Sequence, residues 1–94
     1  MISVLYVDDD PTHRDIAKLY LEKDREFSVE TVVSARDALT KENLAGYDAI
    51  VSDYQMPAID GIEFLQSLRA AGNNVPFILF TGRGREEVVI RAFN

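Results

Sequence analysis

The alternation of short apolar runs with helical patterns constrains the fold of this chain more than any other feature. The runs 2–7 (ISVLYV), 47–52 (YDAIVS) and 75–80 (VPFILF) are short and mainly apolar, which is typical of strands buried on both faces of a sheet. The run 27–33 (FSVETVV) alternates and predicts a more exposed strand. Helical patterns separate these runs, so the chain predicts parallel strands joined by helical crossovers.

Local signals mark where the helices begin and end. Asp10 followed by Pro11 fits an N-cap and a first helical residue. Ser34 with Asp37 resembles a capping box, and residues 85–93 predict the start of a fourth helix. The other markers are Ile16, Leu19, Tyr20 and Lys23 in the first helix; Ala35, Ala38, Leu39 and the terminal Gly46 in the second; Ile62, Leu65, Leu68, Arg69 and the terminal Gly72 in the third; and Val88, Val89, Ala92 and Phe93 in the fourth.

Four strands connected in this way predict one doubly wound α/β domain, with a parallel sheet between two helical layers. The length of 94 residues suits a single domain, and 47% apolar residues suits a globular one. A net charge of −6 gives no support for binding to nucleic acid or to a membrane surface. The chain has no cysteine, no signal-peptide pattern and no apolar run long enough to span a membrane, so we expect a cytoplasmic module.

Polar side chains follow three of the four predicted strands. Asp8, Asp9 and Asp10 follow the first, Asp53 follows the third and Thr81 follows the fourth. The carboxyl ends of parallel strands share one edge of the sheet, where the sites of open α/β folds lie. Crowded carboxylates suit a hard divalent cation such as Mg²⁺, which binds phosphate oxygens as well. One carboxylate could then act as a nucleophile and form an acyl phosphate. The alternative is that these acids only cap helices or solvate turns. That alternative explains a single acid well, but it does not explain why polar residues follow three strands at the same edge of the sheet.

Three segments together resemble the receiver domain of two-component response regulators: LYVDDDP, VSDYQMPAIDG and FILFTG. The resemblance runs from Ser3 to the end of the chain. It implies a flavodoxin-like, three-layer fold with strand order 2-1-3-4. It also implies that Asp53 accepts a phosphoryl group from the phosphohistidine of a sensor histidine kinase or a phosphotransfer protein. Such a receiver is a signalling domain that catalyses only its own phosphorylation.

The same resemblance implies roles for the other site residues. Asp9 would bind Mg²⁺ directly and Asp8 through a water molecule, while Asp53 and the backbone carbonyl of Gln55 would complete the protein ligands. Thr81 would contact the phosphoryl group and move inward, which would switch the face around the fourth helix.

The chain departs from the family at its C-terminal end. Receivers continue into a fifth strand, which carries a lysine near its end, and a fifth helix. Here no lysine follows Thr81, and we do not expect Arg83 or Arg85 to replace it. We expect residues 1–94 to be a single receiver domain shortened at its C-terminus, and we favour a fragment of a longer protein over a chain whose open edge is covered by a partner chain. An output or kinase domain in the same longer chain is one arrangement, and the sequence leaves open whether the receiver stands alone. Its strand 76–80 (PFILF) would be a bare apolar edge, and a homodimer through the fourth strand and fourth helix is a possible partner arrangement.

Two other functions are consistent with parts of the sequence. A docking module that keeps the receiver fold without being phosphorylated would explain the absent lysine. A haloacid-dehalogenase-like phosphatase would use Asp8 as nucleophile and Asp10 as general acid, in the pattern Asp8-x-Asp10-x-Thr12, and Asp53 would be expendable.

Several other residues are expected to have structural roles. The lone histidine, His13, is expected to face solvent without a catalytic role. Tyr54, next to Asp53, is expected either to influence access to that residue or to have a simple surface role. The remaining aromatic residues considered are expected to pack in the core or beneath helices: Tyr6, Tyr20, Phe27, Phe64, Phe77 and Phe80.

Overall fold

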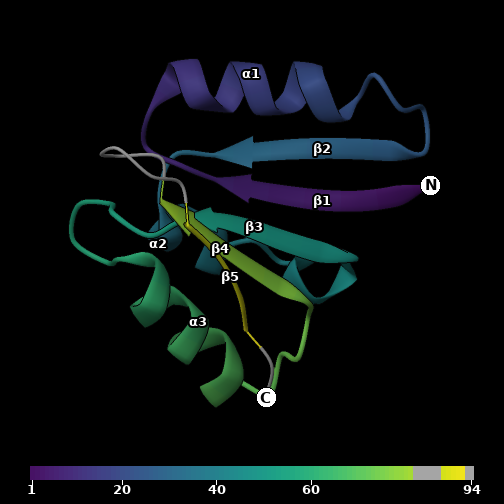
Figure 1. Ribbon diagram of the computed structural model, residues 1–94. Coiled ribbons are helices and arrows are strands. Elements are labelled where there is room, and N and C mark those ends of the chain that lie inside the picture. Colours follow the sequence, from purple (N-terminus) through teal and green to yellow (C-terminus); the bar gives the residue numbers. More distant parts are fainter. Residues whose placement is uncertain (82–87, 93–94) are drawn as a thin grey trace.

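Strand β1 (Ile2–Val7) lies inside the sheet and is buried on both faces, as its apolar sequence predicts. The computed structural model describes residues 1–81 and 88–92, with side chains for residues 1–80. It has one sheet of order β2-β1-β3-β4-β5 (Figure 1). The first four strands are parallel, which confirms the predicted order 2-1-3-4. The other strands are β2 (Phe27–Val32), β3 (Ala49–Asp53), β4 (Phe77–Thr81) and β5 (Val88–Ala92).

Helices cover both faces of the sheet, which confirms the three-layer architecture (Figure 1). Helix α1 (Pro11–Leu21) lies on one face over Val4, Tyr6 and Val29. Helix α2 (Ala35–Leu39), the 3-10 turn η1 (Leu44–Gly46) and helix α3 (Gly61–Ala70) lie on the other. The larger core is on that second face and includes Leu5, Val7, Ile50, Phe64, Leu68, Phe77 and Leu79. None of the helices in the described ranges is long and apolar enough to cross a membrane.

The helix starts agree with the sequence signals, but the ends of the first two helices do not. Helix α1 ends at Leu21, so Lys23, which was predicted on that helix, lies in the turn that follows it. Ser34 caps α2 as predicted, because its hydroxyl accepts from the Asp37 N–H. The prediction that this helix continues to Gly46 is wrong, since it ends at Leu39 and a separate 3-10 turn follows. The Thr40 hydroxyl donates to the Asp37 carbonyl, a local hydrogen bond of the kind that competes with helix continuation. Gly72 ends α3 with a φ of +83°, as expected for a glycine that follows a helix.

The fourth helix predicted over 85–93 is not found where the structure describes that segment. Residues 88–92 form β5, which pairs antiparallel with β4 from Thr81–Val88 to Phe77–Ala92. Residues 85–87 and 93 lie outside the described residues. The segment begins with β-branched residues, which favour a strand, and β4 offers unpaired backbone groups at its edge. The edge of β4, which was expected to be bare, is therefore paired with β5. The predicted homodimer through the fourth strand no longer has an unpaired edge at β4 to form on.

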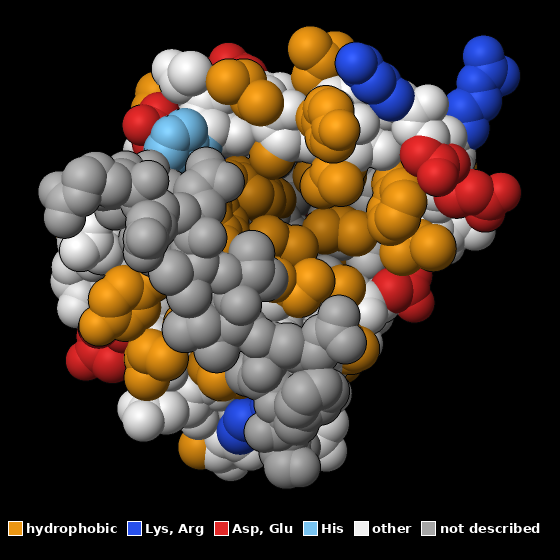
Figure 2. Space-filling model, in the orientation of Figure 1, with side chains coloured by type: hydrophobic (Ala, Val, Ile, Leu, Met, Phe, Trp, Pro, Cys, Tyr) orange, Lys and Arg blue, Asp and Glu red, His pale blue; other side chains and the backbone are white. Residues whose placement is uncertain are grey.

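The outer surface of α1 is more apolar than expected. Ile16, Leu19 and Tyr20 are 59%, 71% and 69% exposed, while Ala17 and Leu21 pack toward the sheet. The core role predicted for Tyr20 is therefore wrong, although the helix itself is correct. Figure 2 shows hydrophobic side chains gathered around α1 and the adjacent part of the sheet on this face.

The charged side chains of Lys18 in α1 and of Glu22, the residue that caps its C-terminal end, occupy part of the open edge of β2. The N–H of Ile2 donates to the Glu26 carbonyl, so the even-numbered residues of β2 direct their backbone groups toward β1. The backbone N–H and C=O groups of the odd-numbered residues consequently point away from β1, toward the open edge. At Val29, the carbonyl accepts from Lys18 Nζ at 2.6 Å and the N–H donates to Glu22 Oε2 at 2.8 Å. The hydrogen bond from Val29, followed by that from Lys18, lowers the pKa of Glu22. This pair of side chains blocks strand addition at Val29.

Candidate functional site

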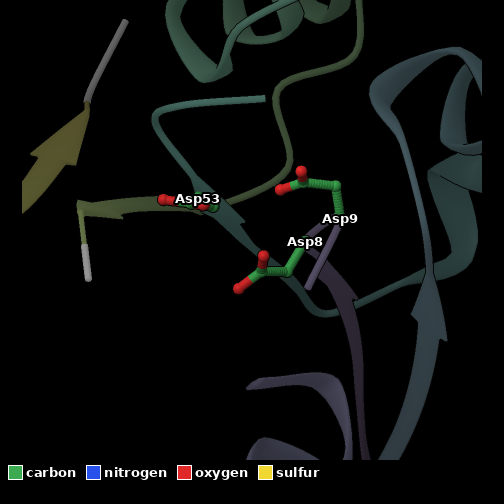
Figure 3. Close-up of side chains that lie close together, drawn as sticks. All are labelled: Asp8, Asp9 and Asp53. Carbon is green, nitrogen blue, oxygen red and sulfur yellow. The ribbon is translucent and has the colours of Figure 1, made fainter. Parts of the chain in front are cut away.

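The sheet register brings the three predicted acids together. Val7 pairs with Ser52, so Asp8 and Asp9 follow β1 beside Asp53 at the end of β3. One carboxylate oxygen of each acid lies within 4.8 Å of the others (Figure 3). Asp8 and Asp53 are fully buried, and Asp9 is half-buried. The clustering expected from the strand ends is therefore present.

The donor set of this cluster fits Mg²⁺. Asp8, Asp9 and Asp53 offer only oxygen atoms, which hard divalent cations prefer over nitrogen or sulfur. Three carboxylates at this separation also repel one another strongly in a partly buried site. A divalent cation would offset that repulsion, so charge and ligand chemistry favour the same ion.

A cleft of about 490 Å³ opens beside the acidic cluster. Asp9 lines it on one side, and the loop that follows β3 lines it on the other through Tyr54, Gln55, Met56, Pro57 and Asp60. Gln55, the predicted carbonyl ligand, is thus on the same cleft as Asp9. Tyr54 is 40% exposed, in keeping with the surface position expected for it. The cleft is large enough for a small phosphorylated group.

The loop after β3 is fixed by the start of α3. The Asp60 carboxylate accepts from the Glu63 N–H, and Glu63 Oε1 accepts from the Asp60 N–H, each at 2.9 Å. This capping box was not predicted from the sequence. Gly61 follows and donates its N–H to the Tyr54 carbonyl at 2.9 Å. A Cβ at Gly61 would lie 2.6 Å from the Asp53 carbonyl oxygen, so α3 begins directly against the strand that carries Asp53.

Four residues hold Asp8 in place. Its Oδ2 accepts from the Tyr6 hydroxyl at 3.1 Å and lies 3.2 Å from His13 Nδ1, while its Oδ1 accepts from the Asp10 N–H at 3.0 Å. The Arg14 guanidinium donates to the Asp8 carbonyl at 2.8 Å. The prediction that His13 faces only solvent is wrong, because its ring is half-buried against Asp8.

Sequence reasoning missed Tyr6 and His13 as neighbours of the site, although signals for both existed. Tyr6 precedes Asp8 by two residues and therefore lies on the same side of the extended chain. His13 is in the first turn of α1, three residues after its N-cap, where side chains reach back toward the cap. Burial, followed by the charge and hydrogen bond of Asp8, raises the pKa of Tyr6 far above its usual value, so its hydroxyl remains a donor.

Asp10 acts as a cap, as predicted. Its Oδ1 accepts from the Thr12 N–H at 2.8 Å and from the His13 N–H at 3.4 Å, so Asp10 closes the first turn of α1. Among the described residues, the acidic cluster with metal-binding geometry contains Asp8, Asp9 and Asp53 but not Asp10.

Thr81 ends β4, next to the site along the sheet. Asp53 pairs with Phe80, and the Tyr54 N–H donates to the Phe80 carbonyl at 2.7 Å. The backbone of Thr81 therefore follows directly after the residue that pairs with Asp53. The Thr81 side chain and residues 82–87, with Arg83 and Arg85, lie outside the described part of the chain.

Comparison with known proteins identifies the family. A family model for the response regulator receiver domain matches residues 4–94, and the chain belongs to that family. A protein-glutamate methylesterase/protein-glutamine glutaminase from a Nocardioides species is 40% identical over 81 residues, which are 85% of this chain and 22% of that protein.

Solved structures give the same result for the fold. The receiver domain of the Francisella response regulator 1452 is 30% identical, with a TM-score of 0.80 over 90% of this chain and 69% of that one. A chain from the crystal structure of histidine kinase ThkA in complex with response regulator protein TrrA is 29% identical. Its TM-score is 0.78, over 90% of this chain and 72% of that one. The chain spans 22% to 37% of the length of three curated relatives that it matches.

Proposed function

We propose that this chain is the phosphoacceptor receiver of a two-component signalling system, with Asp53 as the acceptor. The observation that carries the proposal is the convergence of Asp8, Asp9 and Asp53 within 4.8 Å at the carboxyl edge of a receiver-fold sheet. Membership of the receiver family supports the same assignment. Asp8, Asp9, Asp53 and the Gln55 carbonyl are the proposed Mg²⁺ ligands.

The proposed reaction is transfer of a phosphoryl group from a phosphohistidine to Asp53. An oxygen of the Asp53 carboxylate attacks phosphorus, a P–O bond forms, and the P–N bond to the imidazole breaks. The imidazole leaves with the electron pair of that bond and takes up a proton. Bound Mg²⁺ would neutralise charge on the transferring group. In this scheme Thr81 contacts the phosphoryl group. We do not propose that it switches the face of a fourth helix, because residues 88–92 form the strand β5.

The proposed partner is a sensor histidine kinase or a phosphotransfer protein in the cytoplasm. The similarity to a structure of a kinase in complex with a response regulator supports this class of partner. We propose that residues 1–94 act as one receiver unit and that output or kinase segments can share its polypeptide. The curated relatives, which are much longer than this chain, support that arrangement.

The two other functions are less well supported by the site. In a phosphatase of the haloacid-dehalogenase type, Asp10 would be a general acid, but its carboxylate caps α1 through two backbone N–H groups. A docking module would have no use for three carboxylates held at metal-binding separation.

Beryllium fluoride, a phosphoryl mimic that binds to a carboxylate, distinguishes these functions. With Mg²⁺ present, we expect it to raise the melting temperature of the parent chain by several degrees, because a ligand that binds only the folded state stabilises it. The Asp53→Asn variant should show no rise. A rise retained in Asp53→Asn but lost in Asp8→Asn would support the phosphatase, and no rise in a folded parent chain would support the docking module.

A further inference from the structure

The hydroxyl of Tyr6 reaches the acidic cluster from inside the core. Tyr6 is buried beside Val4 and Val29 on the α1 face of the sheet. Its hydroxyl is 3.1 Å from Asp8 Oδ2 in a buried hydrogen bond. A buried tyrosine hydroxyl usually finds a hydrogen-bond partner, most often to satisfy the hydroxyl itself. Here the polar end of the side chain is directed at one of the proposed metal ligands.

The ring of Tyr6 is held in a fixed position. It stacks on Phe80 with 5.7 Å between ring centroids and 22° between the ring planes. Phe80 belongs to β4 and pairs with Asp53 in the sheet. The Tyr6 ring therefore extends from β1 over the face of β3 to Phe80 of β4, and its hydroxyl cannot leave Asp8 without disturbing that packing.

The hydrogen bonds to Asp8 divide its two oxygens into different roles. Oδ2 receives the Tyr6 hydroxyl and faces His13 Nδ1, and Oδ1 receives only the Asp10 N–H among the described residues. Each carboxylate oxygen accepts about two hydrogen bonds. Oδ1 therefore has a lone pair left for an ion or for a water molecule bound to the ion. The donors to Oδ2 fix the rotation of the carboxylate about its bond to the side chain.

We propose that Tyr6 is a positioning residue for the magnesium site: its hydroxyl fixes the rotation of the Asp8 carboxylate and so raises the affinity of the cluster for Mg²⁺. This inference rests on the proposed function, since it concerns the same ion. Hydrogen-bond partners of metal ligands typically change metal affinity by about 10- to 100-fold when they are removed. Because His13 still contacts Oδ2, the lower end of that range is expected.

The test compares Tyr6→Phe with Tyr47→Phe. The first variant removes the hydroxyl and keeps the ring that stacks on Phe80. The second removes a matched hydroxyl, since Tyr47 is also buried and donates to a carboxylate, Glu30 Oε1, at 2.6 Å. Tyr47 precedes β3, at the end of that strand opposite Asp53.

Two readouts are measured for each variant, together with its melting temperature without Mg²⁺. Calorimetric titration with Mg²⁺ should give roughly tenfold weaker binding for Tyr6→Phe and a change of less than about twofold for Tyr47→Phe. The Mg²⁺ concentration that gives half-maximal phosphorylation by acetyl phosphate should rise by the same factor in Tyr6→Phe. The rate at saturating Mg²⁺ should stay close to that of the parent, which a general loss of folding would not allow.

The outcomes separate this inference from the proposed function. Equal Mg²⁺ affinity in Tyr6→Phe and the parent overturns the positioning role, while the proposed function stands. An equal loss in Tyr47→Phe also overturns it, because the effect would then not be local. A folded parent that binds no Mg²⁺ contradicts both the inference and the metal site of the proposed function.

Discussion

A Gly61→Ala chain is expected to lose about 2–3 kcal/mol of unfolding free energy, the usual cost of forcing extra volume into a packed site. The added Cβ would lie 2.6 Å from the Asp53 carbonyl oxygen and 2.3 Å from Leu79 Cδ1. The leucine can turn away, but the carbonyl belongs to the backbone of β3. Relief therefore requires α3 or the end of β3 to move, and that movement displaces Asp53 from the cluster.

Thermal melting of the Gly61→Ala variant measures this effect. For a domain of this size the loss corresponds to a melting temperature lower by roughly 10–20 °C. Gly46→Ala is the matched control, since nothing lies within 4 Å of a Cβ at Gly46 and its φ is not positive. Its free energy of unfolding should change by less than about 0.5 kcal/mol. Equal melting temperatures for the two variants would show that α3 does not begin directly against the end of β3.

An Asp9→Asn chain is expected to be more stable than the parent without metal and to lose the response to Mg²⁺. Two unit charges about 5 Å apart interact by about 3 kcal/mol at an effective dielectric constant near 20. Asp9 is half-buried and contacts solvent, so we expect a gain of about 1–2 kcal/mol when its charge is removed. The same change removes a proposed ligand, and Mg²⁺ should then bind at least about tenfold more weakly.

Melting temperatures with and without Mg²⁺ test both parts of this prediction. The parent should gain stability as Mg²⁺ is added, because the ion binds only the folded cluster. The melting temperature of Asp9→Asn should be higher than that of the parent without Mg²⁺ and should stay nearly constant as Mg²⁺ is added. Asp15→Asn, which removes an exposed acid of α1, should behave like the parent. A variant that is less stable than the parent without metal would contradict the account of repulsion within the cluster.

The fold and the acidic cluster were accessible from the sequence because both depend on strong local patterns. The apolar run of β1 and the acids at its end place Asp8 and Asp9 at the sheet edge, and the parallel topology brings Asp53 to the same edge. The resemblance to receivers is the source of the roles proposed for Gln55 and Thr81, which no pattern of spacing could assign.

The errors fall where tertiary contacts outweigh local preference. Residues 88–92 have apolar spacing that suits a helix and β-branched residues that suit a strand, and pairing with β4 decides between them. Helical spacing located α1 correctly, but it did not show that Tyr20 faces outward while Leu21 packs inward. The contacts of Tyr6 and His13 with Asp8 depend on where two rings end in space, which periodicity does not specify.

The most direct test of the central claim is the intact mass of the chain after incubation with acetyl phosphate. The parent chain is compared with Asp53→Asn, each with Mg²⁺ and with a chelator. The account predicts a gain of one phosphoryl group in the parent that requires Mg²⁺ and is absent in Asp53→Asn. No gain in a folded parent chain, or a gain that survives in Asp53→Asn, would contradict the assignment of Asp53 as the phosphoacceptor.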